Sequence, residues 1–241
     1  MKNILFTFLI LALTGNFVFA QVARNATEVS QNQKALAANE AQLERDLGEL
    51  QAFTTKLSQF ETAFTNKDVS KVAAIKTDLL TDMQREIEQS QKKIAQDKQE
   101  VAQSKSEAVS SNREVKRSRR DQVTADGDIG DGRDKRDDKR DRRDDARDTQ
   151  DDKNDLNQQI ARTNRQKEIY KTLMAFTFSF EPSVQEKVLA NKALFGEFVS
   201  TMQRDIEATK TEIAEDKREA REDSRERRED RREKRERIRN K

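Results

Sequence analysis

Residues 47–64, LGELQAFTTKLSQFETAF, repeat apolar side chains with the rhythm of a long helix. Apolar residues recur every seven positions, and a second apolar line follows three or four positions later. This spacing places both lines on one face of a helix and resembles a coiled-coil seam. It predicts a helix over residues 24–65. The first line comprises Val22, Val29, Leu36, Leu43, Leu50, Leu57 and Phe64, and the second comprises Leu47, Phe53 and Phe60.

The same rhythm predicts a second helix over residues 69–124. Asp68 or Asn66 is expected to cap its start, because a short polar side chain can accept a hydrogen bond from the free N–H groups there. Beyond Ile94 the second line becomes polar, so the far half of this helix is expected to bury little. The apolar line comprises Ala73, Leu80, Ile87, Ile94, Val101, Ala108 and Val115.

The second half of the chain repeats the first. MQREIEQSQKKIAQDKQE (83–100) and MQRDIEATKTEIAEDKRE (202–219) are identical at ten of eighteen positions. This match indicates an internal duplication. It predicts two further helices, over 133–178 and 182–238, with Pro182 at the first position of the last helix, where proline is tolerated.

These elements predict an all-α fold, a coiled-coil-like up-down-up-down four-helix bundle built from two duplicated helical hairpins. The first hairpin is expected over 21–125 and the second over 133–241, ending in a charged helix or tail. A Gly/Asp turn at 126–132 joins them. Short connections make neighbouring helices antiparallel, which predicts one Phe-rich end and one charged stalk.

Residues 133–155 consist almost entirely of Asp, Arg and Lys. Seven of their ten Asp residues, from Asp134 to Asp155, alternate spacings of three and four, which forms one helix face that is expected to lie in water. An EF-hand loop needs Gly at position 6 and an acidic residue at 12, but a loop starting at Asp126 has Asp131 at position 6. The pattern therefore favours a solvated helix, with cation or mineral-surface binding as an alternative role.

The first 20 residues have the plan of a secretory signal peptide: Lys2, a short apolar run, and small residues before a cleavage point after Ala20. The apolar run is too short to span a membrane. We therefore expect an exported protein, periplasmic or extracellular, with no stable membrane span after cleavage.

The composition argues against several functional classes. The chain has no Cys, His or Trp, so zinc and copper sites and His- or Cys-based catalysis are not expected. No enzyme, cofactor, metal or small-molecule substrate is predicted. Lys and Arg number 48 and Asp and Glu 46, interleaved along the chain, which argues against nucleic-acid binding.

The remaining prediction is a non-enzymatic helical scaffold, spacer or protein-interaction module, with a protein partner or self-association. In its long helices and basic composition the chain is similar to the Skp-type periplasmic chaperones, although no motif is shared. That similarity implies a holdase-type chaperone as an alternative. Phe178 is the candidate protein contact, because a continuing helix would turn it away from Phe176 and Phe180.

Overall fold

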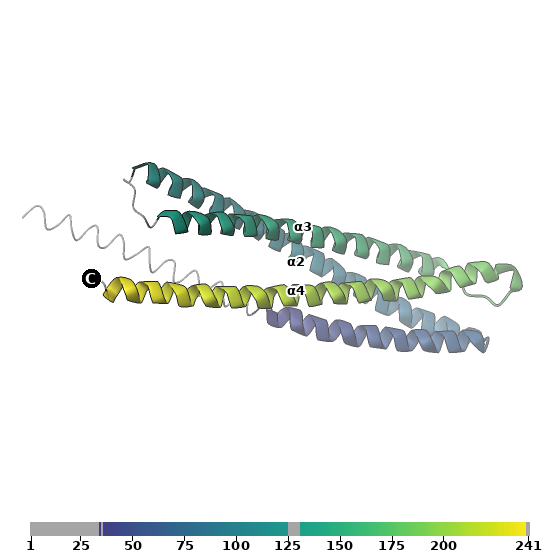
Figure 1. Cartoon of the computed structure of the whole chain (residues 1–241). Helices are drawn as coiled ribbons and strands as arrows, with labels where there is room; N and C mark the ends of the chain where they lie inside the picture. Colours follow the sequence, from purple (N-terminus) through teal and green to yellow (C-terminus); the bar gives the residue numbers. More distant parts are fainter. Residues whose placement is uncertain (1–33, 35, 125–130, 240–241) are drawn as a thin grey trace, which may run out of the picture. The chain divides into compact units, whose positions relative to one another are not determined.

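The structure is a computed structural model that describes residue 34 and residues 36–124 and 131–239 (Figure 1). Within these ranges the chain is all-helical, with no strand. The first helix covers 36–65, and it is followed by α2 (Val69–Thr124), α3 (Asp131–Ala175), the short 3-10 turn η1 (Pro182–Val184) and α4 (Gln185–Arg239). The expected signal peptide, the expected helix start at 24 and residues 126–130 of the expected turn lie outside the described residues.

The turn before α2 forms as the sequence predicts. Lys67 adopts a left-handed backbone conformation with φ of 54°, and the chain then enters α2 at Val69. The carboxylate of Asp68 accepts a hydrogen bond of 3.1 Å from the backbone N–H of Lys71. This bond satisfies one of the free donors at the helix start, so Asp68 is the cap.

Both predicted ends of α3 need correction. The helix begins at Asp131 and includes Gly132, whereas we expected it to begin after that glycine. It ends at Ala175, three residues before the predicted end at 178. The residues that follow, FTFSFE, are rich in aromatic and β-branched types that favour extended backbone. Glu181, which precedes Pro182, is also extended, as a residue before proline prefers.

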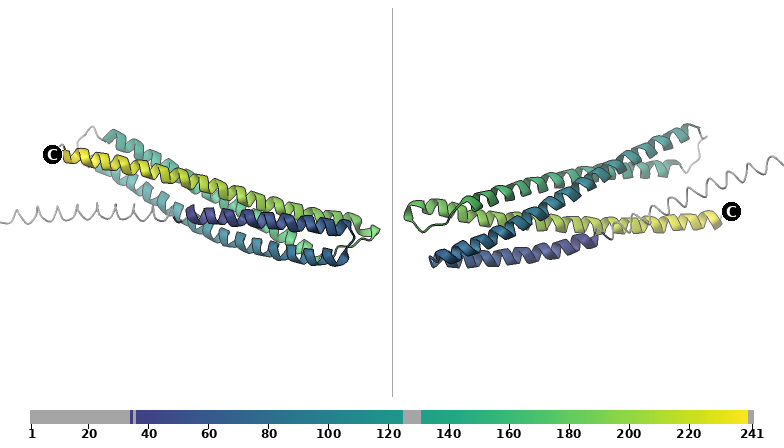
Figure 2. Two further views of the ribbon diagram at one scale, coloured as in Figure 1. Left: turned by 90° about the horizontal axis from the view of Figure 1, so that it is seen from below. Right: turned by 180° about the vertical axis from the view of Figure 1, so that it is seen from behind.

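The described chain divides into two compact units, which we treat separately. The larger unit covers residues 51–203, and the smaller unit combines residues up to Leu50 with Arg204 onward. In the larger unit, α2 and α3 pack against each other, as the views from below and behind also show (Figure 2). The hydroxyl of Tyr170 donates to Gln84 at 3.4 Å, and Ser90 donates to Gln166 at 3.2 Å. Later residues of α2 thus meet earlier residues of α3, so the two helices run antiparallel.

Other contacts in the larger unit join the first helix to α2 and to α4, which also run antiparallel to it. Lys56 of the first helix pairs with Asp82 of α2 at 2.6 Å. The ring of Phe53 in the first helix lies 5.5 Å from that of Phe198 in α4. Lys192, earlier in α4, pairs with Glu61, later in the first helix, at 2.5 Å. Both pairs of helices are therefore antiparallel within this unit.

The most deeply buried residues of the first helix lie on its second predicted apolar line and not on its first. Phe53 and Phe60, in the second predicted line of the first helix, are buried, whereas the described members of the first line are only half-buried. One predicted core position is wrong: Leu47 is 44% exposed. The fully buried apolar residues of the larger unit are Phe53, Phe60, Leu79, Met83, Ile169, Leu173, Val188, Phe195 and Phe198.

A buried polar layer lies between α2 and α3, further from the Phe residues along both helices. Ser90 donates to Gln166, and Thr163 donates to the backbone carbonyl of Gln159 at 2.9 Å. The side-chain carbonyl of Gln159 accepts from Arg162 at 2.6 Å. Buried polar groups are costly unless they are hydrogen-bonded, so such a layer favours one helix register over others. The layer comprises Glu86, Ser90, Lys93, Gln159, Thr163 and Gln166.

The smaller unit is held by the start of the first helix and the later part of α4. Asn39 donates to Asp216 at 3.1 Å, and Lys217 pairs with Glu40 at 2.7 Å. Ile206 and Ile213 are buried, at 3% and 7% exposed, as the duplicated stripe predicts for α4.

The charged parts of the helices lie largely in water where their side chains are described. Asp151 and Asp155 are exposed, in agreement with the predicted solvated Asp face, and Thr149 is buried on the predicted inner side. In α2, Val109 is 50% exposed, as expected for its far half. No helix in the described ranges is long and apolar enough to cross a membrane.

Candidate interaction site at the aromatic end

The larger unit gathers all eight Phe residues that follow the expected signal peptide, and we call this cluster the aromatic end. Phe60 lies at its centre, with ring centroids 5.0 Å from Phe178 and 5.2 Å from Phe195. Offset and edge-on ring arrangements at such distances stabilise a core beyond simple area burial. The aromatic end comprises Phe53, Phe60, Phe64, Phe176, Phe178, Phe180, Phe195 and Phe198.

Phe178 lies inside this cluster, so the prediction that it is exposed is wrong. It is 9% exposed, and its ring contacts those of Phe60, Phe64, Phe176 and Phe195. The prediction assumed helical spacing through residue 178, but α3 ends at Ala175. In the non-helical segment that follows, the position of Phe178 no longer obeys a 100° rotation per residue. Its burial removes the basis for a protein contact at this position.

Two lysines anchor the aromatic end from its edge. The ammonium of Lys192 lies 4.4 Å from the centre of the Phe64 ring while it pairs with Glu61. Lys76 of α2 donates to the backbone carbonyl of Phe176, just past the end of α3. Burial lowers the pKa of Lys76 from its ordinary value. These contacts fix the start of α4 to the first helix, and the segment that follows α3 to α2.

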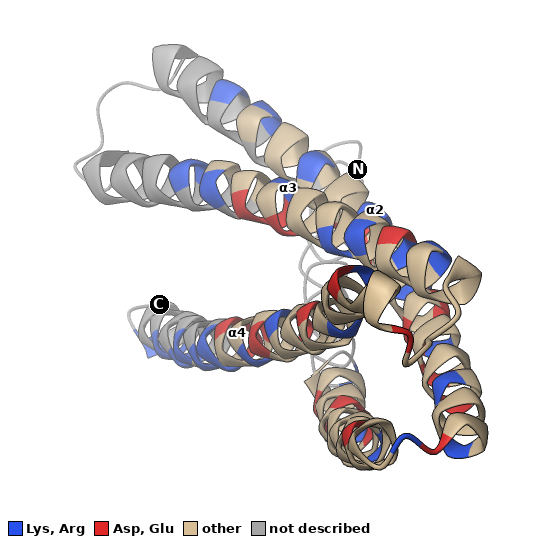
Figure 3. Ribbon diagram, turned by 90° about the vertical axis from the view of Figure 1, so that its right-hand side faces the viewer, with Lys and Arg blue, Asp and Glu red and all other residues tan. Residues whose placement is uncertain are grey.

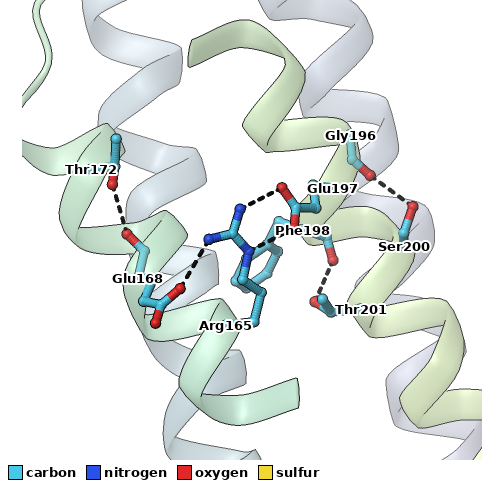
Figure 4. Close-up of polar contacts among 8 residues, drawn as sticks. All are labelled: Arg165, Glu168, Thr172, Gly196, Glu197, Phe198, Ser200 and Thr201. Carbon is cyan, nitrogen blue, oxygen red and sulfur yellow. Dashed lines mark hydrogen bonds and ion pairs between the residues drawn. The ribbon is translucent and has the colours of Figure 1, made fainter. Parts of the chain in front are cut away.

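A surface ion-pair cluster links α3 to α4 (Figure 4). Arg165 donates to both carboxylate oxygens of Glu197, at 2.6 and 2.8 Å, and to Glu168 at 2.9 Å. Hydrogen bonds to Glu197 and then to Glu168 raise the pKa of the Arg165 guanidinium. The two-pronged geometry orients α3 against α4, because a planar guanidinium matches a carboxylate in one plane.

Three large apolar side chains remain exposed close to the aromatic end. Val69 is 64% exposed at the start of α2, Met174 55% near the end of α3, and Leu189 60% near the start of α4. Leu189 directly follows Val188, which is fully buried. Sequence reasoning missed these residues, although a helical wheel centred on Val188, Phe195 and Met202 would turn Leu189 away from the core by about 100°.

The chemistry of this end suits non-covalent recognition. In the part of the chain that the structure describes, no group of three or more acidic side chains is placed to hold a metal ion. The exposed apolar side chains Val69, Met174 and Leu189 are its candidate contacts for a protein partner. Comparison with protein-family models, curated proteins and solved structures finds no match to this chain.

Proposed function

We propose that this protein is an exported, non-enzymatic helical scaffold whose aromatic end binds a protein partner. The observation that carries the proposal is the combination at that end of a buried Phe cluster and the exposed residues Val69, Met174 and Leu189. The helices that carry these side chains are packed on the Phe cluster, so their backbone needs little ordering on binding. The long charged helices provide spacing rather than a concave pocket for a substrate.

We further propose that the chain is an up-down-up-down bundle that arose by duplication of a helical hairpin. Equivalent positions of the two matching segments have the same environment, which supports the duplication. Ile87 and Ile206 are both buried, and so are Ser90 and Thr209. The antiparallel contacts within the larger unit support the bundle topology.

Neighbouring residues of α4 provide a matched test of the binding role. A photo-crosslinking residue placed at Leu189 in the native producing cell is expected to give one discrete adduct, and an additional Val69→Ser, Met174→Ser pair is expected to remove it. These substitutions alter exposed side chains, so the thermal melting temperature should stay within about two degrees of the wild type. Val188→Ser serves as the control, because it alters a buried residue and should lower that temperature.

The same experiment separates the proposed function from its alternatives. A ladder of adducts with many unfolded outer-membrane proteins would instead favour a holdase. No adduct from any of the three exposed positions would reject the aromatic end as a binding site. Cell fractionation and amino-terminal sequencing of the mature chain test export, with Gln21 expected as the first residue.

A further inference from the structure

The last part of α4 carries a continuous face of arginines, which we call the Arg face. Its members alternate spacings of three and four residues, so they follow one side of the helix. Every one of these side chains is exposed in the single chain. Figure 3 shows basic residues recurring along α4 toward its end. The Arg face comprises Arg218, Arg221, Arg225, Arg228, Arg232, Arg235 and Arg239.

The first half of α3 carries an acidic face with the same spacing, which we call the Asp face. Its described side chains, Asp151 and Asp155, are exposed. Partial burial and then the nearby carboxylates of Asp151 and Asp152 raise the pKa of Asp155. The negative charges of Asp151 and Asp152 thus repel that of Asp155, and a cation facing this position would relieve the repulsion. The Asp face comprises Asp134, Asp137, Asp141, Asp144, Asp148, Asp151 and Asp155.

The two faces match residue by residue. Each contains seven members, and every arginine lies 84 positions after one aspartate, as Asp134 and Arg218 or Asp155 and Arg239 illustrate. Parallel helices can therefore pair all seven positions, and antiparallel helices can pair six. Arginine and carboxylate form the strongest common side-chain ion pair because two hydrogen bonds can form at once.

We propose that the Arg face of one molecule docks on the Asp face of a second copy of this chain, in the parallel register that pairs all seven positions. Each copy carries one Arg face and one Asp face. The formal net charge of +2 offers little long-range repulsion between copies. Single exposed pairs contribute little, but a row of them with one spacing selects one partner and one register. This interaction is independent of the role proposed for the aromatic end.

Sedimentation of the mature chain tests the proposal through its salt dependence and through charge exchange. The wild type should associate at about 50 mM NaCl and dissociate toward monomer at about 500 mM, because salt screens exposed charges. Arg225→Glu with Arg228→Glu should weaken self-association by about tenfold or more, and Asp141→Lys with Asp144→Lys should do the same. Lys92→Glu with Lys98→Glu, on exposed positions of α2, is the control with an equal change of charge.

Mixing the Arg225, Arg228 variant with the Asp141, Asp144 variant tests whether the two faces pair with each other. Neither variant can form the original pairs with itself, but the new Glu residues of one face the new Lys residues of the other. The mixture should therefore associate with an affinity within about threefold of the wild type. A wild type that stays monomeric at every salt concentration overturns the proposal. So does a mixture that fails to associate while both variants keep a wild-type helical spectrum, or a control that weakens association as much as the Arg225, Arg228 variant.

Discussion

Phe178 is buried because α3 ends before it, at Ala175, and not at residue 178 as the pattern suggests. Its ring is buried among four other Phe rings, so truncation leaves a cavity. Phe178→Ala is expected to reduce the free energy of unfolding by about 3 kcal/mol, measured by urea denaturation. Leu189→Ala, at an exposed position, should change it by less than about 0.5 kcal/mol. Equal effects of the two substitutions would contradict the packing described for the aromatic end.

Asp68 stabilises the start of α2 through its bond to the backbone of Lys71. That hydrogen bond is the largest cause of the lowered pKa of Asp68. Asp68→Ala removes the cap and should lower the melting temperature by a few degrees, whereas Asp78→Ala, in the exposed middle of the helix, should not. Because the pKa is lowered on folding, the contribution of Asp68 is present above about pH 4 and is lost as the pH falls further. Thermal melts at pH 7 and pH 3 check both statements.

Asp216 of the smaller unit should behave in the opposite way. Burial raises its pKa, although the hydrogen bond from Asn39 partly counteracts the rise. A carboxyl whose pKa rises on folding destabilises the folded state at neutral pH, and this cost disappears as the pH falls through the raised value toward the ordinary 3.8. Asp216→Asn should therefore raise the melting temperature at pH 7 and have a smaller effect at pH 4. A loss of stability at pH 7 would show that the charge itself is favourable there.

The polar layer of α2 and α3 is a feature of elements rather than of single residues. Ser90→Ala removes the donor to buried Gln166 and should cost about 1 to 2 kcal/mol of unfolding free energy. In a double-mutant cycle, Gln166→Leu combined with Ser90→Ala should cost less than the sum of the single changes, because neither half of the Ser90–Gln166 hydrogen bond is then left without the other. Strict additivity would mean that the hydrogen bond contributes nothing to stability.

At this scale the sequence predicts some features and misses others for physical reasons. The bounds of α2 follow from its unbroken period and its Asp68 cap, and both are confirmed. The end of α3 was missed although the period changes there: Phe176, Phe178 and Phe180 alternate at a spacing of two, which is typical of extended backbone. The polar layer was also missed. Apolar periodicity carries no information about Gln159 and Gln166, which are polar residues at buried positions.

For the whole molecule, the sequence predicts unequal sensitivity to proteolysis. The glycines of 126–132 favour turn conformations, whereas 84–95 contains the buried residues Ile87, Ser90 and Lys93. Brief digestion with subtilisin should cut first within 126–132 and leave two fragments that still sediment together. A first cut within 84–95 would contradict the hairpin organisation that we propose.

The uninterrupted length of α2 gives the molecule a mechanical property. Its 56 residues rise by about 1.5 Å each, so the helix is roughly 84 Å long. If a partner bound at the aromatic end tilted the helix by about five degrees, its far end would move by roughly 7 Å, from the same rise per residue. Such a tilt would make the helix a lever arm, which converts a small movement at its base into a displacement the size of an amino-acid side chain at its tip.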